Sequence, residues 1–146
     1  MKRTLLLALF AIFVTNSYSQ KTSAEEAIKK VLEKESASWR SGDVKAHAAC
    51  WFVQPYSRIL VSTGDGKVFD VPVSSMINPS PNSMGKGGTS SNSNYKMSVS
   101  GKNAWVSHDE ESISPDGVKT YSSEFRILER IKGEWKLVGQ SIMIKK

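Results

Sequence analysis

A short segment in the last third of the chain, residues 104–112, holds side chains that could carry out acid–base chemistry. Its sequence, AWVSHDEES, contains one of only two histidines in the chain, followed by three acids. In a β-strand, His108 and Glu110 lie on one face with α-carbons ~7 Å apart, whereas Asp109 and Glu111 take the other face. His108 and Glu110 are the candidate catalytic pair, because the ordinary pKa of histidine lies near neutrality. The alternative is that both are solvated side chains at the end of a strand.

Further polar residues suggest a ligand pocket. Glu124 and Arg126 share a face of the next predicted strand, where they either orient a polar ligand or pair at the surface. His47 lies beside Trp51 on the apolar face of a predicted helix, either as a satisfied core histidine or as a pocket-lining group. The other candidate pocket residues are Trp39, Tyr56 and Arg58, with core packing as the alternative for the aromatic ones.

Other site chemistries find little support in the sequence. A metal centre needs three or four convergent ligands, and Asp109 and Glu111 cannot join His108 from the opposite face, so we expect no metal site. No nucleophile elbow, phosphate loop or dinucleotide fingerprint is present, and no cofactor is expected. The single cysteine, Cys50, has apolar neighbours and is predicted to be a buried inert thiol, with a nucleophile as the alternative.

The N-terminus has the pattern of a secretory signal peptide. Lys2 and Arg3 precede an apolar run from Leu5 to Val14, and small residues at Ser17 and Ser19 offer a cleavage site. The run is too short for a membrane span, which takes about 20 residues; an uncleaved anchor is the alternative. We therefore expect residues 1–19 to be removed and residues 20–146 to form one domain, exported to the periplasm or secreted.

The charge pattern argues against nucleic-acid binding. Without residues 1–19, 18 basic residues face 14 acidic ones, a formal net charge of +4. These charges are interspersed, and no basic stripe with interleaved aromatic residues is present. The mature chain is expected to bind neither nucleic acid nor membrane. A single cysteine also leaves no internal disulfide, so the core must supply the stability.

Two helices are predicted before the first strand. Apolar residues recur at three- and four-residue intervals over residues 24–39, with Glu35 at one position of the stripe, which is typical of a helix packed by one face. Gly42 ends this helix as a C-terminal cap. Asp43 caps a shorter helix that reaches about Phe52. The short link makes the two helices a hairpin.

Strands and turns are predicted for the rest of the chain. Residues 58–71 form a β-hairpin with a turn at 64–66, and a short helix begins at Pro72. Residues 78–94 are almost wholly small and polar, which predicts a long flexible loop, either a lid or a disordered insertion. Four antiparallel strands are then expected, at 95–100, 105–112, 120–131 and 135–144. This order of elements defines an α+β protein.

The final predicted strand is apolar on both faces. Alternation places Trp135, Leu137 and Met143 on one face, and the apolar residues of the other face are Val138, Ile142 and Ile144. A strand of this kind needs two cores, or a core and a partner. We therefore expect a homodimer that associates through the sheet.

Particular segments resemble the NTF2-like superfamily, which includes ketosteroid isomerases, SnoaL-like polyketide cyclases and the DUF4440 group. The first predicted helix ends in SWRSGDVKAH, similar to the superfamily's aromatic residue, Gly-Asp and second helix. The last strands carry a basic-Gly turn leading into WKLV. The resemblance covers about residues 24–144. It implies N-terminal helices packed on a strongly bent antiparallel sheet, a conical pocket between them, and dimerisation through the outer face of the sheet.

The resemblance also bears on activity. Ketosteroid isomerases place a carboxylate base on the strand after the second helix, where this chain reads SRILVST and has no acid. The histidine that many relatives carry in the final strand is also absent, since Gly139, Gln140 and Ser141 stand there. We therefore expect a non-catalytic module that binds a small, partly apolar ligand or a partner protein. The alternatives are a small SnoaL-like enzyme using His108 or His47 with Glu110, and an accessory domain for association.

Overall fold

The computed structural model describes residues 23–80 and 82–145, and the predicted signal peptide lies outside these ranges. A long helix covers residues 23–41. The elements that follow are α2 (Val44–Ala48), β1 (Ile59–Ser62), β2 (Val68–Val71), α3 (Ser74–Ile77), β3 (Thr89–Ser100), β4 (Asn103–Ile113), β5 (Lys119–Ile131) and β6 (Glu134–Ile144). Within the described ranges, no helix combines the length and apolar character needed to cross a membrane.

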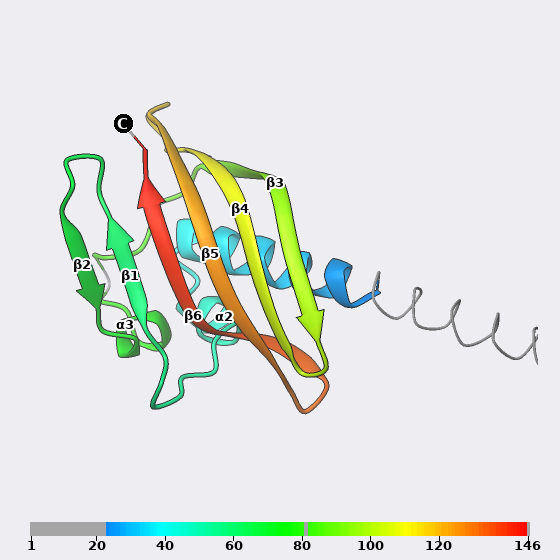
Figure 1. Cartoon of the computed structure of the whole chain (residues 1–146). Helices are drawn as coiled ribbons and strands as arrows, with labels where there is room; N and C mark the ends of the chain where they lie inside the picture. Colours follow the sequence, from blue (N-terminus) through cyan, green and yellow to red (C-terminus); the bar gives the residue numbers. More distant parts are fainter. Residues whose placement is uncertain (1–22, 81, 146) are drawn as a thin grey trace, which may run out of the picture.

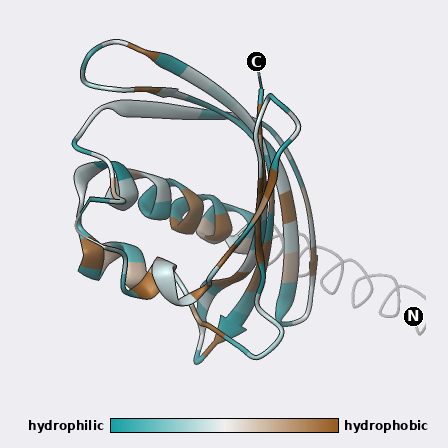
Figure 2. Cartoon of the chain, turned by 90° about the vertical axis from the view of Figure 1, so that its left-hand side faces the viewer, coloured by the Kyte–Doolittle hydropathy of each residue, from teal (hydrophilic) through white to brown (hydrophobic). Residues whose placement is uncertain are grey.

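The strands form one six-stranded sheet in the order β2-β1-β6-β5-β4-β3. β3 to β6 are an antiparallel meander, as predicted, but β1 runs parallel to β6, with Ile59 opposite Gln140. The sheet is therefore mixed rather than wholly antiparallel, because the β1–β2 hairpin is laid beside the last strand. The long helix lies behind the sheet in Figure 1, and Figure 2 shows the strands curving around the helices. The predicted α+β architecture of helices on a bent sheet is confirmed.

The two N-terminal helices end and begin at the predicted signals. Gly42 has a φ of 74°, the left-handed conformation that glycine adopts at helix C-termini. The Asp43 side chain accepts a hydrogen bond from the amide three residues on, at 2.9 Å. α2 is shorter than predicted, because Trp51 leaves the helix to form an isolated parallel bridge with Leu137 of β6.

The hydrophobic core occupies one end of the space between the long helix and the sheet. Ile28 and Leu32 of the helix pack with Val106, Leu128 and Leu137 of the sheet, and all five are almost inaccessible to solvent. Further along β4, β5 and β6 the inward positions become polar, and the buried ones there are His108, Ser122, Glu124, Arg126 and Gln140. The molecule thus has an apolar core at one end and a buried polar region beside it.

A bulge in β6 changes which residues face inward. The pairing of β5 with β6 shifts at Val138, an extra residue in β6, and such a bulge reverses the alternation of the strand. Before it, Trp135 and Leu137 are buried in the core; after it, Met143 is exposed and Ile142 faces inward. The predicted grouping of Trp135, Leu137 and Met143 on one face is therefore wrong.

The loop predicted over residues 78–94 is shorter than expected. Residues 89–94 belong to β3, and residues 89–93 pair with β4 through backbone hydrogen bonds, for which small polar side chains suffice. The preceding segment packs over the end of the long helix. The amide of Gly85 donates to the carbonyl of Trp39 at 3.0 Å, and Met84 is buried.

Candidate functional site

A cavity of about 480 Å³ lies between the long helix and the concave face of the sheet. Its lining has an apolar part and a charged part. Apolar side chains come from the long helix, β1, β2, α3 and β6, and they are Trp39, Ile59, Val61, Val71, Met76, Ile142 and Ile144. Charged and amide side chains come from the long helix, β4, β5 and β6, and they are Glu35, Arg40, Glu110, Glu124, Arg126 and Gln140. A molecule in this cavity would meet an apolar wall on one side and a charged wall on the other.

Arg126 of β5 occupies the centre of the charged wall, and the residue is only 4% exposed. Its guanidinium donates two hydrogen bonds to Glu124 and one to the side-chain oxygen of Gln140. Its Nη1 lies 3.5 Å from Oε2 of Glu35. Burial alone would lower the pKa of Arg126, but Glu35 and Glu124 raise it above its ordinary value. The guanidinium therefore stays charged although it is buried.

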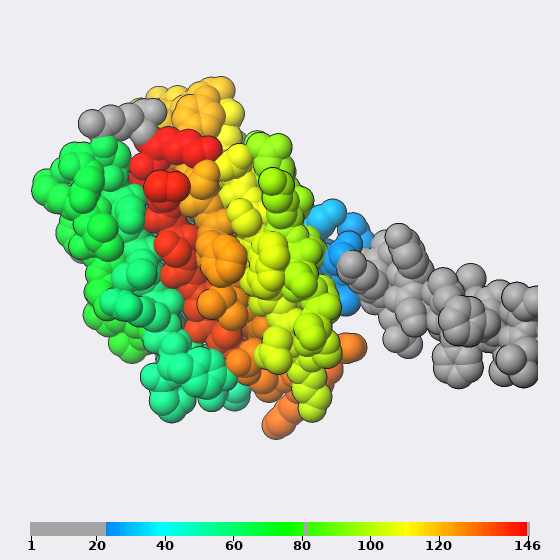
Figure 3. Space-filling view, viewed as in Figure 1, coloured from blue at the N-terminus to red at the C-terminus, as the bar shows by residue number. Residues whose placement is uncertain are grey.

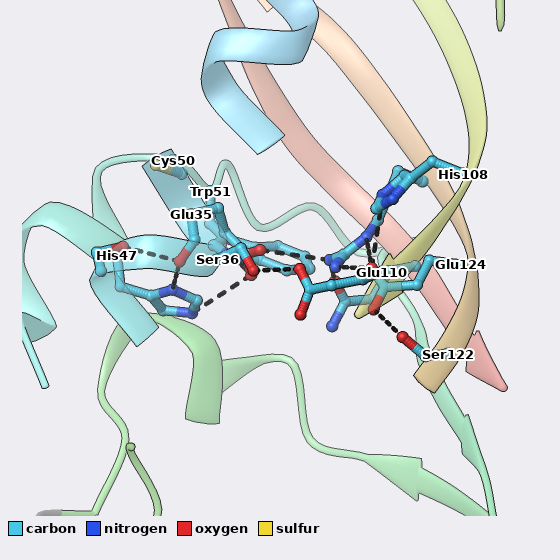
Figure 4. Close-up of polar contacts among 12 residues, drawn as sticks. Glu35, Ser36, His47, Cys50, Trp51, His108, Glu110, Ser122 and Glu124 are labelled. Carbon is cyan, nitrogen blue, oxygen red and sulfur yellow. Dashed lines mark hydrogen bonds and ion pairs between the residues drawn. The ribbon is translucent and has the colours of Figure 1, made fainter. Parts of the chain in front are cut away.

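A buried histidine lies behind each of these two carboxylates (Figure 4). Nδ1 of His47 lies 3.2 Å from the backbone oxygen of Glu35 and carries the proton, because a carbonyl only accepts. Nε2 of His47 lies 3.7 Å from the Glu35 carboxylate. On the other side, Nε2 of His108 lies 3.5 Å from Oε2 of Glu124. The chain of contacts His47–Glu35–Arg126–Glu124–His108 thus runs from α2 through the long helix and β5 to β4.

The charge states along this chain follow from burial and neighbouring charges. Burial lowers the pKa of His108, which outweighs the opposing effect of Glu124, so the imidazole is neutral near neutral pH. Burial would raise the pKa of Glu124, but Arg126 and His108 bring it below its ordinary value. Glu124 is therefore a carboxylate and His108 an uncharged neighbour.

Glu110 of β4 supplies a third carboxylate to the cavity wall. Its Oε2 accepts a hydrogen bond from the hydroxyl of Ser36, and its Oε1 accepts one from Ser112 at 2.7 Å. Nη1 of Arg40 lies 3.5 Å from the same Oε1. A carboxylate has about four lone-pair sites, so Glu110 keeps acceptor capacity for a ligand.

The structure places four of the predicted site residues in the cavity wall: Trp39, Glu110, Glu124 and Arg126. His108 and Glu110 share the inward face of β4, as strand alternation predicts. The carboxylate near Nε2 of His108 is that of Glu124, however, at 3.5 Å, and not that of Glu110. The predicted pair is therefore close in the fold without being in mutual contact.

The other predicted residues lie behind the wall or on the surface. Trp51 lies behind, next to His47, and its indole N–H donates to Glu35 at 3.4 Å. Tyr56 is 63% exposed and does not line the cavity. Arg58 forms an exposed ion pair with a β2 aspartate, because Ile59 beside it takes the inward position. The pocket assignments of Tyr56 and Arg58 do not match their positions in the structure.

Several cavity residues were absent from the prediction. Glu35, Ser36 and Arg40 come from the long helix, and Gln140 comes from β6. Glu35 had a usable sequence signal. An acid within an apolar helical stripe is buried together with the stripe, and a buried acid needs a partner. No sequence signal indicates Gln140, because the bulge in β6 reverses the alternation that would predict which face its side chain takes.

Metal binding and thiol chemistry have no visible support in the part of the chain that the structure describes. No group of three or more histidine, cysteine or acidic side chains that could hold a metal ion comes together there. Cys50 is buried, as predicted, and burial raises the pKa of its thiol. A protonated thiol is a weak nucleophile.

Comparison with known proteins identifies the fold. No protein-family model and no curated protein matches the chain. An NTF2-like protein of unknown function from Shewanella baltica is similar in structure, with a TM-score of 0.65, 15% identity, and coverage of 86% of this chain and 96% of the other. An NTF2-like protein of unknown function from Methylobacillus flagellatus has a TM-score of 0.62 and 18% identity, covering 85% and 94%.

A third similar structure has a more specific description. It is a putative scytalone dehydratase from Novosphingobium aromaticivorans, with a TM-score of 0.65, 14% identity, and coverage of 88% of this chain and 89% of the other. At such identities the likeness concerns the fold alone, because one fold hosts many activities. The chain has the NTF2-like fold, as its sequence predicts.

Proposed function

We propose that this protein binds a small, partly apolar molecule in its cavity without transforming it. The observation that carries the proposal is a cavity of about 480 Å³ with one apolar wall and one charged wall. Ligand sites in proteins are typically concave, mostly apolar and ~300–1,000 Å³ in volume, with a few placed polar groups. The cavity has both the size and the chemistry of such a site.

The charged wall supports the proposal because its groups are already held in position. Arg126 fixes Glu124 and Glu35, and the hydroxyls of Ser36 and Ser112 fix Glu110. Groups that are ordered before binding lose little conformational entropy when a ligand arrives. The apolar part of the ligand would lie against β1 and β6, and its polar part would face β4 and the long helix.

An acid–base enzyme of the SnoaL-like kind is the second candidate, since Glu110 lines the cavity. A general base must come within ~3 Å of the proton that it removes. His108 contacts Glu124 and is not among the cavity-lining residues, so a ligand would meet a carboxylate before the imidazole. This arrangement favours binding over histidine catalysis.

Filling the cavity tests the binding proposal. The probe is the apolar dye Nile red, whose fluorescence increases in apolar surroundings. Ile142→Trp places a bulky ring in the cavity, and we expect it to weaken dye binding about tenfold or more. Met143→Trp is the matched control, because the adjacent Met143 is exposed on the other face of β6. Circular dichroism and urea unfolding verify that both variants are folded.

Two results would overturn the proposal. One is a folded wild-type protein that does not bind the dye. The other is dye binding that survives Ile142→Trp but is lost in Met143→Trp, which would place the apolar site on the convex face.

A further inference from the structure

The charges on the cavity wall do not balance. Three carboxylates line the cavity, from Glu35, Glu110 and Glu124, against two guanidiniums, from Arg40 and Arg126. The side chains that line the cavity therefore carry one excess negative charge. The whole chain, in contrast, has a formal net charge of +6. The cavity is therefore an acidic site in a basic protein, and its charge would favour positively charged ligands.

The positive groups of the wall are already committed to protein acceptors. Arg126 donates to Glu124 and Gln140 and faces Glu35. Nη1 of Arg40 donates to Ser36 at 2.6 Å. A negatively charged ligand would have to displace these contacts while lying close to three carboxylates. Like charges repel more strongly in a site removed from bulk water than in solution.

The buried histidine behind the wall does not offset the negative charge. His108 is 2% exposed, and neither ring nitrogen has a hydrogen-bond partner among the described residues. Its ring lies against Glu124 (Figure 4), and Nε2 is 3.5 Å from the carboxylate. Glu124 and Glu35 share the single guanidinium of Arg126, so a cation on the cavity side of this wall would provide the charge that the imidazole does not. Uncompensated charge in a buried site is costly, so such a cation would be favoured.

We propose that the cavity ligand is an amphipathic amine, with one protonated amino group on an apolar body. The proposal rests on the binding function above and specifies the class of ligand. The ammonium group lies at Glu110, where hydroxyl oxygens of Ser36 and Ser112 are also acceptors. The apolar body lies against Ile59 and Ile142. One bound ammonium cation makes the wall electrically neutral.

Three probes with one tail isolate the effect of the head group: n-octylamine, 1-octanol and octanoate. Each is titrated into the purified mature protein near neutral pH, where the amine is protonated and the acid ionised. Affinity is measured by calorimetry and by displacement of Nile red. We expect octylamine to bind about tenfold more tightly than octanol, and octanoate to bind most weakly.

Glu110→Gln tests where the preference comes from. This variant removes the excess charge but keeps the shape of the side chain. It should lower the octylamine affinity about tenfold, close to that of octanol. Glu111→Gln is the matched control, because Glu111 lies on the opposite face of β4, where it accepts from Lys119 at 2.7 Å. It should leave all three affinities as in the wild type.

The outcomes separate this inference from the binding proposal. Octanol or octanoate binding as tightly as octylamine, or a preference for the amine that survives Glu110→Gln, overturns the inference while cavity binding stands. If the dye binds but octylamine does not displace it, the amine inference fails and the binding proposal stands. If neither the dye nor any of the three probes binds, both proposals fail.

Discussion

Arg126 joins two carboxylates that come from different elements, Glu124 from its own strand and Glu35 from the long helix. When one partner of a buried ion pair is removed, the remaining charge stays buried without compensation, and this costs more than the intact pair contributes. The exposed pair of Arg58 and Asp70, at 2.9 Å, is different because both groups keep their water.

This contrast predicts the effect of two matched substitutions. Arg126→Met should lower the free energy of unfolding by about 3–5 kcal/mol, because Glu35 and Glu124 lose their shared cation. Arg58→Met should change it little. Urea denaturation followed by tryptophan fluorescence measures both. Equal effects of the two substitutions would show that the buried network does not contribute to stability.

Strand alternation in the sequence predicts which polar residues share a face, but not which face is inward. It places His108 with Glu110 and Glu124 with Arg126, and both pairs are found on the concave face. The partners of these residues come from the long helix, as Glu35 does, and contacts across layers leave no local pattern. This is why the sequence indicates members of the site but not their contacts.

At the level of elements, the parts with strong local signals agree with the prediction. The long helix, its end at Gly42 and the cap at Asp43 follow from periodicity and capping chemistry. The start of β3 has no such signal, because its serines and asparagines do not alternate in hydropathy. The chain enters it through Gly88, where an added Cβ would lie 2.2 Å from the carbonyl oxygen of Ile113. Backbone pairing, not side-chain pattern, forms this part of the strand.

Two features of the sheet depend on contacts that the sequence does not reveal. β1 pairs in parallel with β6, far along the chain. The bulge at Val138 brings Gln140 and Ile142 into the cavity wall. Both features help build the cavity, so its lining could be predicted only in part.

At the level of the whole molecule, the convex face of the sheet carries large apolar side chains. Those at its centre are between 42% and 55% exposed, and they are Trp105, Phe125, Ile127 and Met143. The rings of Trp105 and Phe125 stack with centroids 5.8 Å apart. Figure 3 shows this face, with β5 and β6 crossing its middle. Exposed apolar patches of this kind mark association surfaces, and we propose that two copies dimerise through it.

The dimer proposal predicts the oligomeric state of the wild type and of two variants. Light scattering after size exclusion should give a dimer for the wild type and a monomer for Phe125→Lys, because a charge would be buried in the interface. Val68→Lys should remain dimeric, since Val68 is exposed on the edge strand β2, away from the patch. A wild-type monomer would contradict the proposal, as would a dimer that Phe125→Lys leaves intact.

We propose that the ligand occupies the cavity under the long helix. Intermolecular NOEs between bound Nile red and the protein's methyl groups test it most directly, because they report proximity atom by atom. We expect NOEs to the methyl groups of Val61 and Ile142, which line the cavity. NOEs only to Ile127 and Met143, on the convex face, would contradict it.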